Sequence, residues 1–394
     1  MLKEKIDALA RDIHDMTVGC RRHLHQNPEL SFEEYQTSAF VKGELDKLGI
    51  PHRSMANTGV VAEIQGALPS DKTVALRADM DALPIEEVSG RAYGSKRNGV
   101  MHACGHDAHT ASLLGTARIL QTLKNDFSGT IRLIFQPGEE KLPGGASLML
   151  KEGVLESPKP QAVIGQHVMP LIPAGKVGFR AGKYMASTDE LYITVKGKGG
   201  HGAQPQQNID PVLITAHIIT ALQQVVSRMA DPKMPSVLSI GKVIANGATN
   251  VIPDQVYLEG TFRTFDEEWR KEAHTRMRKL ASGIAESMGG VCDFEVRVGY
   301  PFLVNEEKLT AEVRGYAEEY LGKENVLDLD LWLAAEDFAY YSQVADACFY
   351  RLGTGNESKG IMSAVHTATF DIDEEALAVS TGLMAYIALR RLGN

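Results

Sequence analysis

The feature that most limits the fold of this chain is an alternation of strand-like and helix-like segments along its first half. The strand-like segments are apolar and rich in β-branched residues, and they cover residues 60–64, 73–78, 130–135 and 162–165. Helical apolar spacing marks residues 2–18, about 33–48, about 110–123 and about 145–151. Strands that alternate with helices usually pair in parallel, so the sequence predicts a mostly parallel α/β sheet.

Near residue 184 the order changes to strand, helix, strand, strand, helix, strand. The segments are 191–195, about 210–229, 237–240, 255–260, about 266–288 and 293–298. This is the order of a ferredoxin-like unit. Helical patterns resume at about 306–321 and 374–392, and 394 residues are too many for one ordinary core. We therefore expect a discontinuous first domain, residues 1–183 and 301–394, with an inserted domain, residues 184–300.

Composition limits the partners of the protein. The balance of 41 basic and 50 acidic residues gives a net charge of −9, which argues against nucleic acid or an anionic membrane as the main partner. Four scattered cysteines do not form a disulfide framework. We expect neither a signal peptide nor an apolar run that could span a bilayer, and hence a cytoplasmic location.

Candidate metal ligands are concentrated in residues 101–109, Met-His-Ala-Cys-Gly-His-Asp-Ala-His. Thiolate and imidazole together suit zinc and related transition metals. Gly105 allows the chain to bend between Cys104 and His106. The alternative is a histidine-rich helix start in which Cys104 is a small buried apolar residue.

Further polar residues follow the predicted strands, where α/β sheets bind ligands. They are Asp79, Asp81, Glu139, Glu140 and His167. Neighbouring side chains at an extended end point to different sides. Glu140 is therefore predicted to bind metal while Glu139 accepts a proton from water. Two solvated glutamates in a loop are the alternative.

With a late histidine, these segments supply five donors, Cys104, His106, Glu140, His167 and His366, too many for one tetrahedral zinc. We therefore predict two divalent ions that share a bridging ligand. Asp79 and Asp81 are predicted to orient ligand histidines from outside. The histidines at 23, 25, 102 and 109 are interpreted as structural or supporting.

The ordered set of segments resembles the metal-dependent amidohydrolases of N-acyl amino acids, with hippurate hydrolase and indole-acetyl-amino-acid hydrolases among them. The segments are His-Ala-Cys-Gly-His-Asp-Ala-His, Glu-Glu, His-Val, Gly-Gly-His-Gly-Ala, Thr-Asn-Val-Ile-Pro and a late histidine. The resemblance covers essentially the whole chain. It implies a metallopeptidase-like catalytic domain with an inserted ferredoxin-like lid (dimerisation) domain.

Carried over by position, the resemblance implies metal ligation by the five donors and a base at Glu139. It also implies that His201 contacts the oxyanion or the substrate carboxylate, and that Asn250 and Arg263 bind substrate. Arg263 suits a carboxylate because a guanidinium can bind one bidentately; its alternative is a structural arginine in a strand. Gln206 and Gly138 stand where many members carry histidine and alanine, and Thr367-Ala368-Thr369 replaces a frequent Ser/Asn-Pro stretch.

The resemblance implies hydrolysis of N-acetyl, N-benzoyl or similar amino acids by two divalent ions per subunit, zinc or manganese, with cobalt or nickel also compatible. A homodimer through the lid domain is compatible with it. A dipeptidase or carboxypeptidase with the same metal site is the nearest alternative. A metal-storage protein would not need the carboxylate of Glu139, and a redox-sensing Cys104 lacks a resolving cysteine nearby in the sequence.

Overall fold

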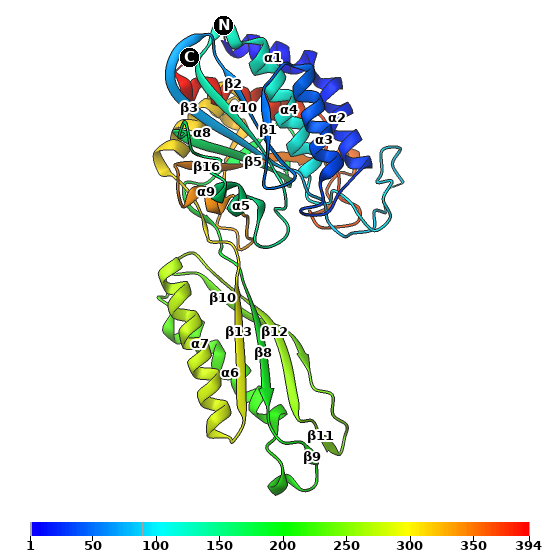
Figure 1. Ribbon diagram of the computed structural model, residues 1–394, viewed down its shortest axis with the longest axis vertical. Helices are drawn as coiled ribbons and strands as arrows, with labels where there is room; N and C mark the ends of the chain where they lie inside the picture. The colour runs from blue at the N-terminus through cyan, green and yellow to red at the C-terminus, as the bar shows by residue number, and fades with distance from the viewer. Residues whose placement is uncertain (1, 89, 394) are drawn as a thin grey trace. The chain divides into compact units, whose positions relative to one another are not determined.

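A computed structural model describes residues 2–88 and 90–393 and divides into two compact units (Figure 1). The first unit comprises Met1–Tyr184, Val304–Leu331 and Asp337–Asn394, and the second comprises Met185–Leu303 and Trp332–Glu336. The predicted domain limits at 183/184 and 300/301 stay predictions, because the units are defined by contacts and not by independent folding.

The first unit contains a mixed eight-stranded sheet. In spatial order its strands are β1 (His52–Met55), β2 (Gly59–Gln65), β4 (Ser128–Gln136), β3 (Leu68–Asp79), β5 (Ala162–Pro173), β16 (Ala347–Gly355), β6 (Val177–Phe179) and β15 (Val326–Asp328). The central strands β4, β3, β5 and β16 are parallel. This confirms the α/β class, with antiparallel pairs β1–β2, β2–β4 and β16–β6 around the parallel centre.

The helices of the first unit are α1 (Leu2–Asp12), α2 (His14–Gln26), α3 (Tyr35–Lys47), α4 (His106–Thr122), α5 (Gly145–Lys151), α8 (Glu307–Leu321), α9 (Ala339–Ser342) and α10 (Ala376–Leu392). Helices α4 and α10 pack on each other and on β3, while α5 packs on β4 and α9 on β16. This cover buries every residue of β16. Strands that are buried on both faces read as near-continuous apolar runs, which explains why most of the central strands could be predicted.

The second unit has the element order β-α-β-β-α-β. Its elements are β8 (Asp189–Lys196), α6 (Pro211–Gln224), β10 (Ser236–Ile244), β12 (Gln255–Thr264), α7 (Glu267–Ser287) and β13 (Val291–Val298), and the antiparallel sheet order is β10-β12-β8-β13. Alternate residues of β8 face a core shared with both helices. A separate two-stranded ribbon pairs β9 (Gly200–His201) with β11 (Val251–Ile252).

One helical segment bears on the expectation that no apolar run spans a bilayer. By length and composition alone, the segment Pro211–Met229 could cross a bilayer, with a mean hydropathy of 1.2. A single helix of this kind is weak evidence, and Ile214, Ile218 and Leu222 of this segment are buried in the core of the second unit. Val212 and Leu213 on the same helix are exposed, so packing on the sheet accounts for only part of its apolar character.

Candidate metal centre

Gly105 places the first two candidate ligands. It has φ +81°, and a Cβ atom added to it would lie 2.5 Å from the Val168 side chain. Glycine adopts this conformation without steric cost and leaves the space that Val168 occupies. The turn brings Cys104 and His106 to the start of α4, beside His167 and Val168 in the middle of β5.

The structure brings the five predicted donors together as two groups that share one atom. The ligand atoms of Cys104, His106 and His167 lie within 4.8 Å of one another, and so do those of Cys104, Glu140 and His366. The Cys104 Sγ atom is 3.3 Å from His167 Nε2 and 3.2 Å from His366 Nε2. His366 Nε2 is 3.2 Å from Glu140 Oε1. Cys104 is therefore the residue common to both groups.

Neighbouring groups leave the inward nitrogens of two histidines available. His167 Nδ1 donates to the Val168 carbonyl at 2.8 Å, and His106 Nδ1 lies 3.1 Å from Asp81 Oδ1. In each ring the Nε2 atom then faces the cluster, as a metal ligand requires. Burial, reinforced by Arg351, lowers the pKa of His167 well below its usual value, so this ring stays neutral.

His106 has the opposite electrostatic environment. Burial favours its neutral form, but the carboxylates of Asp79 and Asp81 outweigh that effect and raise its pKa to about 10. In the absence of a metal ion the ring is therefore protonated at neutral pH. A cation bound at Nε2 would take the place of this proton.

Asp81 lies where the sequence predicted it, against His106, but the shortest contacts of Asp79 go elsewhere. Asp79 lies 2.6 Å from both His109 Nδ1 and Arg77, and 3.7 Å from His106 Nε2. His109 Nε2 in turn accepts from the Val168 N–H at 2.9 Å, next to His167. His109 thus lies in a supporting position beside the centre, one of the two roles that the sequence analysis allowed for it.

The two glutamates lie beside this cluster. Glu139 is 6% exposed, and its Oε1 accepts from the Asp337 N–H at 3.4 Å. Oxygens of Glu139 and Glu140 each lie 4.0 Å from His106 Nε2. The Glu140 N–H donates to Asp81 Oδ2 at 2.9 Å, so the carboxylate that faces His106 also fixes the backbone of Glu140.

The chemistry of the donor set fits metal ions. Burial, with Glu140 and Glu139 adding repulsion, raises the pKa of the Cys104 thiol well above its usual value. His106 Nε2 is buried without a hydrogen-bond partner among the described residues. Buried polar atoms are usually satisfied. Thiolate, imidazole and carboxylate together suit zinc and related divalent ions.

Strain at His366 is also characteristic of a functional site. Its φ is +62°, which is uncommon for a residue other than glycine. Its N–H donates to the Ala103 carbonyl at 2.7 Å, so the strained residue is fixed next to Cys104. Backbone strain of this kind persists where the surroundings hold it, often at binding sites.

The histidines interpreted as structural occupy other environments. His25 is buried with Nδ1 2.8 Å from Asp107 Oδ2, which also accepts from Arg21. His23 stacks on Phe40 with ring centroids 4.2 Å apart. Burial lowers the pKa of His102 to about 4, so this ring is neutral.

The remaining predicted site residues belong to the second unit. The Ala203 N–H donates to His201 Nδ1 at 3.0 Å, which leaves the Nε2 atom of that exposed ring as an N–H donor. Asn250 lies beside it, because the Gly202 N–H donates to the Asn250 carbonyl at 2.8 Å. Arg263 is half-buried on β12 and has no hydrogen-bond or ion-pair partner among the described residues. Burial lowers its pKa and outweighs the opposing effect of the Asp189 carboxylate.

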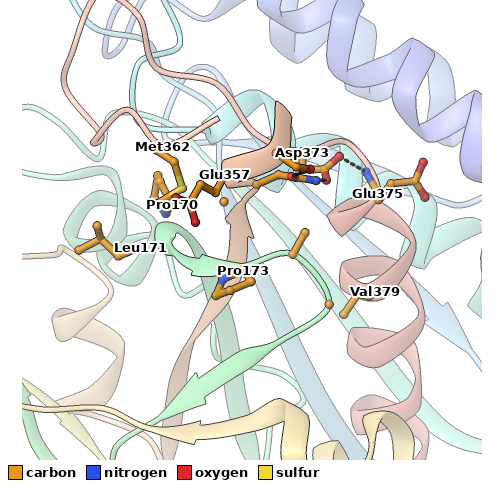
Figure 2. Close-up of a pocket in the computed structure, with 13 residues that line it drawn as sticks. Pro170, Leu171, Pro173, Glu357, Met362, Asp373, Glu375 and Val379 are labelled. Carbon is orange, nitrogen blue, oxygen red and sulfur yellow. Dashed lines mark hydrogen bonds between the residues drawn. The ribbon is translucent and has the colours of Figure 1, made fainter. Parts of the chain in front are cut away.

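A cavity of about 800 Å³ lies elsewhere in the first unit. It is lined by residues that include Pro170, Leu171, Met362, Asp373 and Val379 (Figure 2). None of its lining residues is a predicted ligand. We therefore do not assign it to the metal centre.

The raised pKa values of Cys104 and His106 lead to a measurable proton release. Both groups are protonated near neutral pH without metal, so zinc binding there should release about two protons. As the pH rises toward about 10, His106 loses its proton unaided, so apparent affinity should rise and proton release should fall. Calorimetry in buffers of different ionisation enthalpy measures this release. Cys104→Ser should release about one proton fewer; zinc binding without proton release would contradict the assignment.

Comparison with known proteins identifies the family. Residues 75–390 match Peptidase family M20/M25/M40. The chain is 44% identical to an N-acyl-L-amino acid amidohydrolase of Geobacillus stearothermophilus, over 78% of this chain and 83% of the relative. It is 40% identical to thermostable carboxypeptidase 2 of Saccharolobus solfataricus, over 99% of this chain and 98% of the relative. The fold matches a crystal structure from Bacillus subtilis with a TM-score of 0.82 and 35% sequence identity, over 97% of this chain and 99% of that one. That protein is described as a dinuclear metal binding peptidase from the M20 family. The chain therefore belongs to peptidase family M20/M25/M40.

Proposed function

We propose that this protein is a hydrolase that cleaves the amide bond of N-acyl amino acids with two divalent metal ions. The observation that carries the proposal is the pair of ligand groups joined at Cys104, with the Glu139 carboxylate beside them. The resemblance to an N-acyl-L-amino acid amidohydrolase at 44% identity supports the substrate class. The dinuclear character of the related Bacillus subtilis protein supports the number of ions.

In this proposal Cys104, His106 and His167 hold one ion, and Cys104, Glu140 and His366 hold the other. Bound there, zinc, manganese or a similar ion would activate water and polarise the amide carbonyl. Asp81 keeps His106 oriented, and Asp79 acts through His109 on the backbone beside His167.

Glu139 is the proposed general base and acid. Its carboxylate takes the proton of the attacking water and returns it to the departing amine. A carboxylate suits this role when it lies beside the metal ligands and does not itself bind a metal ion. The contact from the Asp337 N–H holds one of its oxygens and leaves the other toward His106.

The second unit supplies the proposed substrate contacts. The free Nε2–H of His201 is suited to stabilise the oxyanion, because a fixed N–H donor favours the charge that develops in the transition state. Arg263 and Asn250 are the proposed contacts to the substrate carboxylate and amide. His201 belongs to the second unit and the candidate ligands to the first, so we propose that this histidine acts either within one chain or across a dimer. A homodimer and a cytoplasmic location stay predictions.

Peptide hydrolysis is the second candidate. The 40% identity to a carboxypeptidase favours it, and the same water, base and oxyanion donor would serve either amide bond. The two candidates differ in the group on the acyl side of the scissile bond.

A substrate screen tests the proposed function. The protein loaded with zinc, manganese, cobalt or nickel should hydrolyse N-acetyl or N-benzoyl amino acids faster, in kcat/KM, than dipeptides of the same residue. Release of the free amino acid measures turnover. Faster cleavage of dipeptides would favour the peptidase, and no turnover of either class with both ions bound would contradict the proposal.

Adjacent glutamates offer a matched pair of variants. Glu139→Gln should retain two ions and lower kcat by about 10²–10⁴, because an amide cannot take the water proton. Glu140→Gln should instead weaken metal binding, because an anionic ligand is lost. Metal analysis beside steady-state kinetics separates the two outcomes. Loss of an ion from Glu139→Gln, with activity kept, would show that the two roles are reversed.

A further inference from the structure

Glu34 makes contacts with the turn that carries Glu139, although the two residues are far apart in the sequence. Glu34 is fully buried, and its Oε1 accepts from the Gly138 N–H at 2.8 Å. The same oxygen accepts from the Phe32 N–H at 2.8 Å, and Oε2 accepts from the Thr58 hydroxyl at 2.6 Å. Glu34 precedes the first residue of α3 but makes no side-chain cap there. Its carboxylate instead accepts a hydrogen bond from the turn that contains Gly138.

A second contact fixes the same glycine. Gly138 has φ +54°, and a Cβ atom added to it would lie 2.3 Å from Phe32 Cε1. In this chain the Phe32 ring therefore occupies the space that alanine, the residue of many family members at position 138, would need. Phe32 itself has φ +67°, which is uncommon for a residue other than glycine.

The peptide groups on both sides of Gly138 are held. Its N–H belongs to the peptide before it and bonds to Glu34, while its carbonyl accepts from the Gly145 N–H at 3.0 Å. Fixing both peptide planes fixes the Cα position of the next residue, Glu139. The direction in which its side chain leaves the backbone depends also on its own φ, and the Glu140 N–H bond to Asp81 Oδ2 at 2.9 Å holds the peptide that follows.

We propose that Phe32 and Glu34 are positioning residues for Glu139, acting through the backbone of Gly138. The inference rests on the proposed role of Glu139 as base. A base displaced by about 1 Å loses roughly 10²-fold in rate even when binding is intact. The neighbouring Ser31 supports the same arrangement, because its hydroxyl donates to Asp81 Oδ2 at 2.6 Å, and that oxygen also holds the Glu140 N–H.

Three variants of the glutamates test the proposal. Glu34→Ala should lower kcat by roughly 10² at unchanged KM and metal content. Glu34→Gln should retain most of the activity, because its amide oxygen can still accept from Gly138 and Phe32 while its NH₂ faces the Thr58 hydroxyl. The exposed neighbour provides the control, since Glu33→Ala should leave kcat unchanged. Partial unfolding would also lower the apparent kcat at unchanged KM, but it would reduce the metal content, which the proposal predicts to stay unchanged.

A readout without activity separates this proposal from the proposed function. In the metal-free protein, hydrogen exchange at the Gly138 amide should accelerate in Glu34→Ala and stay slow in Glu34→Gln. Unchanged exchange in Glu34→Ala would overturn the positioning role whatever reaction the enzyme performs. Faster exchange without any change in kcat would overturn the link to Glu139.

A double-mutant comparison tests Phe32 even if Glu34→Ala fails to fold. Gly138→Ala should lower kcat by roughly 10² in the presence of Phe32. In a Phe32→Ala background the same substitution should cost at least tenfold less, because the added methyl group then has space and only the strain of the positive φ at position 138 remains. Equal losses in both backgrounds would show that the ring does not set the turn.

Discussion

The arrangement of the first unit depends on the position of one sulfur atom. Cys104 Sγ lies between His167 Nε2 and His366 Nε2, and these three residues come from the start of α4, the body of β5 and a late loop. A local feature holds each segment in place. Gly105 adopts a positive φ, the His167 ring donates a hydrogen bond to the Val168 carbonyl, and His366 has a strained backbone with φ +62°. A shared ligand explains why such distant segments converge.

Charge gives the centre its affinity for cations. Asp79, Asp81, Glu139 and Glu140 surround two histidines and a thiol in a largely buried volume. Arg77 neutralises part of this charge by contacts of 2.6 Å to Asp79 and 2.7 Å to Asp337. Burial and the remaining negative charge raise the pKa of Cys104, and the same negative charge raises the pKa of His106. Without metal, both side chains therefore keep their protons at the proposed binding site. Buried carboxylates of like charge are costly unless a cation accompanies them.

Much of this could be predicted from the sequence. Apolar runs located most central strands, and polar residues after β3 and β4 indicated candidate donors, because parallel strands end at one edge. His167 was expected to follow a strand at 162–165, but β5 continues to Pro173 and His167 lies within it. Strand β16 was missed, since its buried Arg351 and Gly353 break the apolar pattern; the Arg351 guanidinium donates to the Tyr184 hydroxyl at 2.7 Å, a partner no local pattern shows. Residues 2–18 were predicted as one helix, whereas α1 ends at Asp12 and α2 runs from His14 to Gln26.

The supporting residues were harder to predict than the ligands. His109 and Glu34 act on the backbone of other segments, at Val168 and Gly138, and such contacts depend on three-dimensional packing rather than on spacing. Ligands are recognised by residue type, whereas a residue that supports a turn can be any hydrogen-bonding group. The role of Gly138 became visible only with the Phe32 ring beside it.

Anomalous diffraction from crystals of the zinc-loaded protein tests the central claim most directly. The account predicts two zinc peaks about 3.5–4 Å apart. Both should lie about 2.3 Å from Cys104 Sγ, one beside His106 and His167 and the other beside Glu140 and His366. A single zinc ion, or two ions of which only one is bonded to Cys104, would contradict the shared-ligand arrangement.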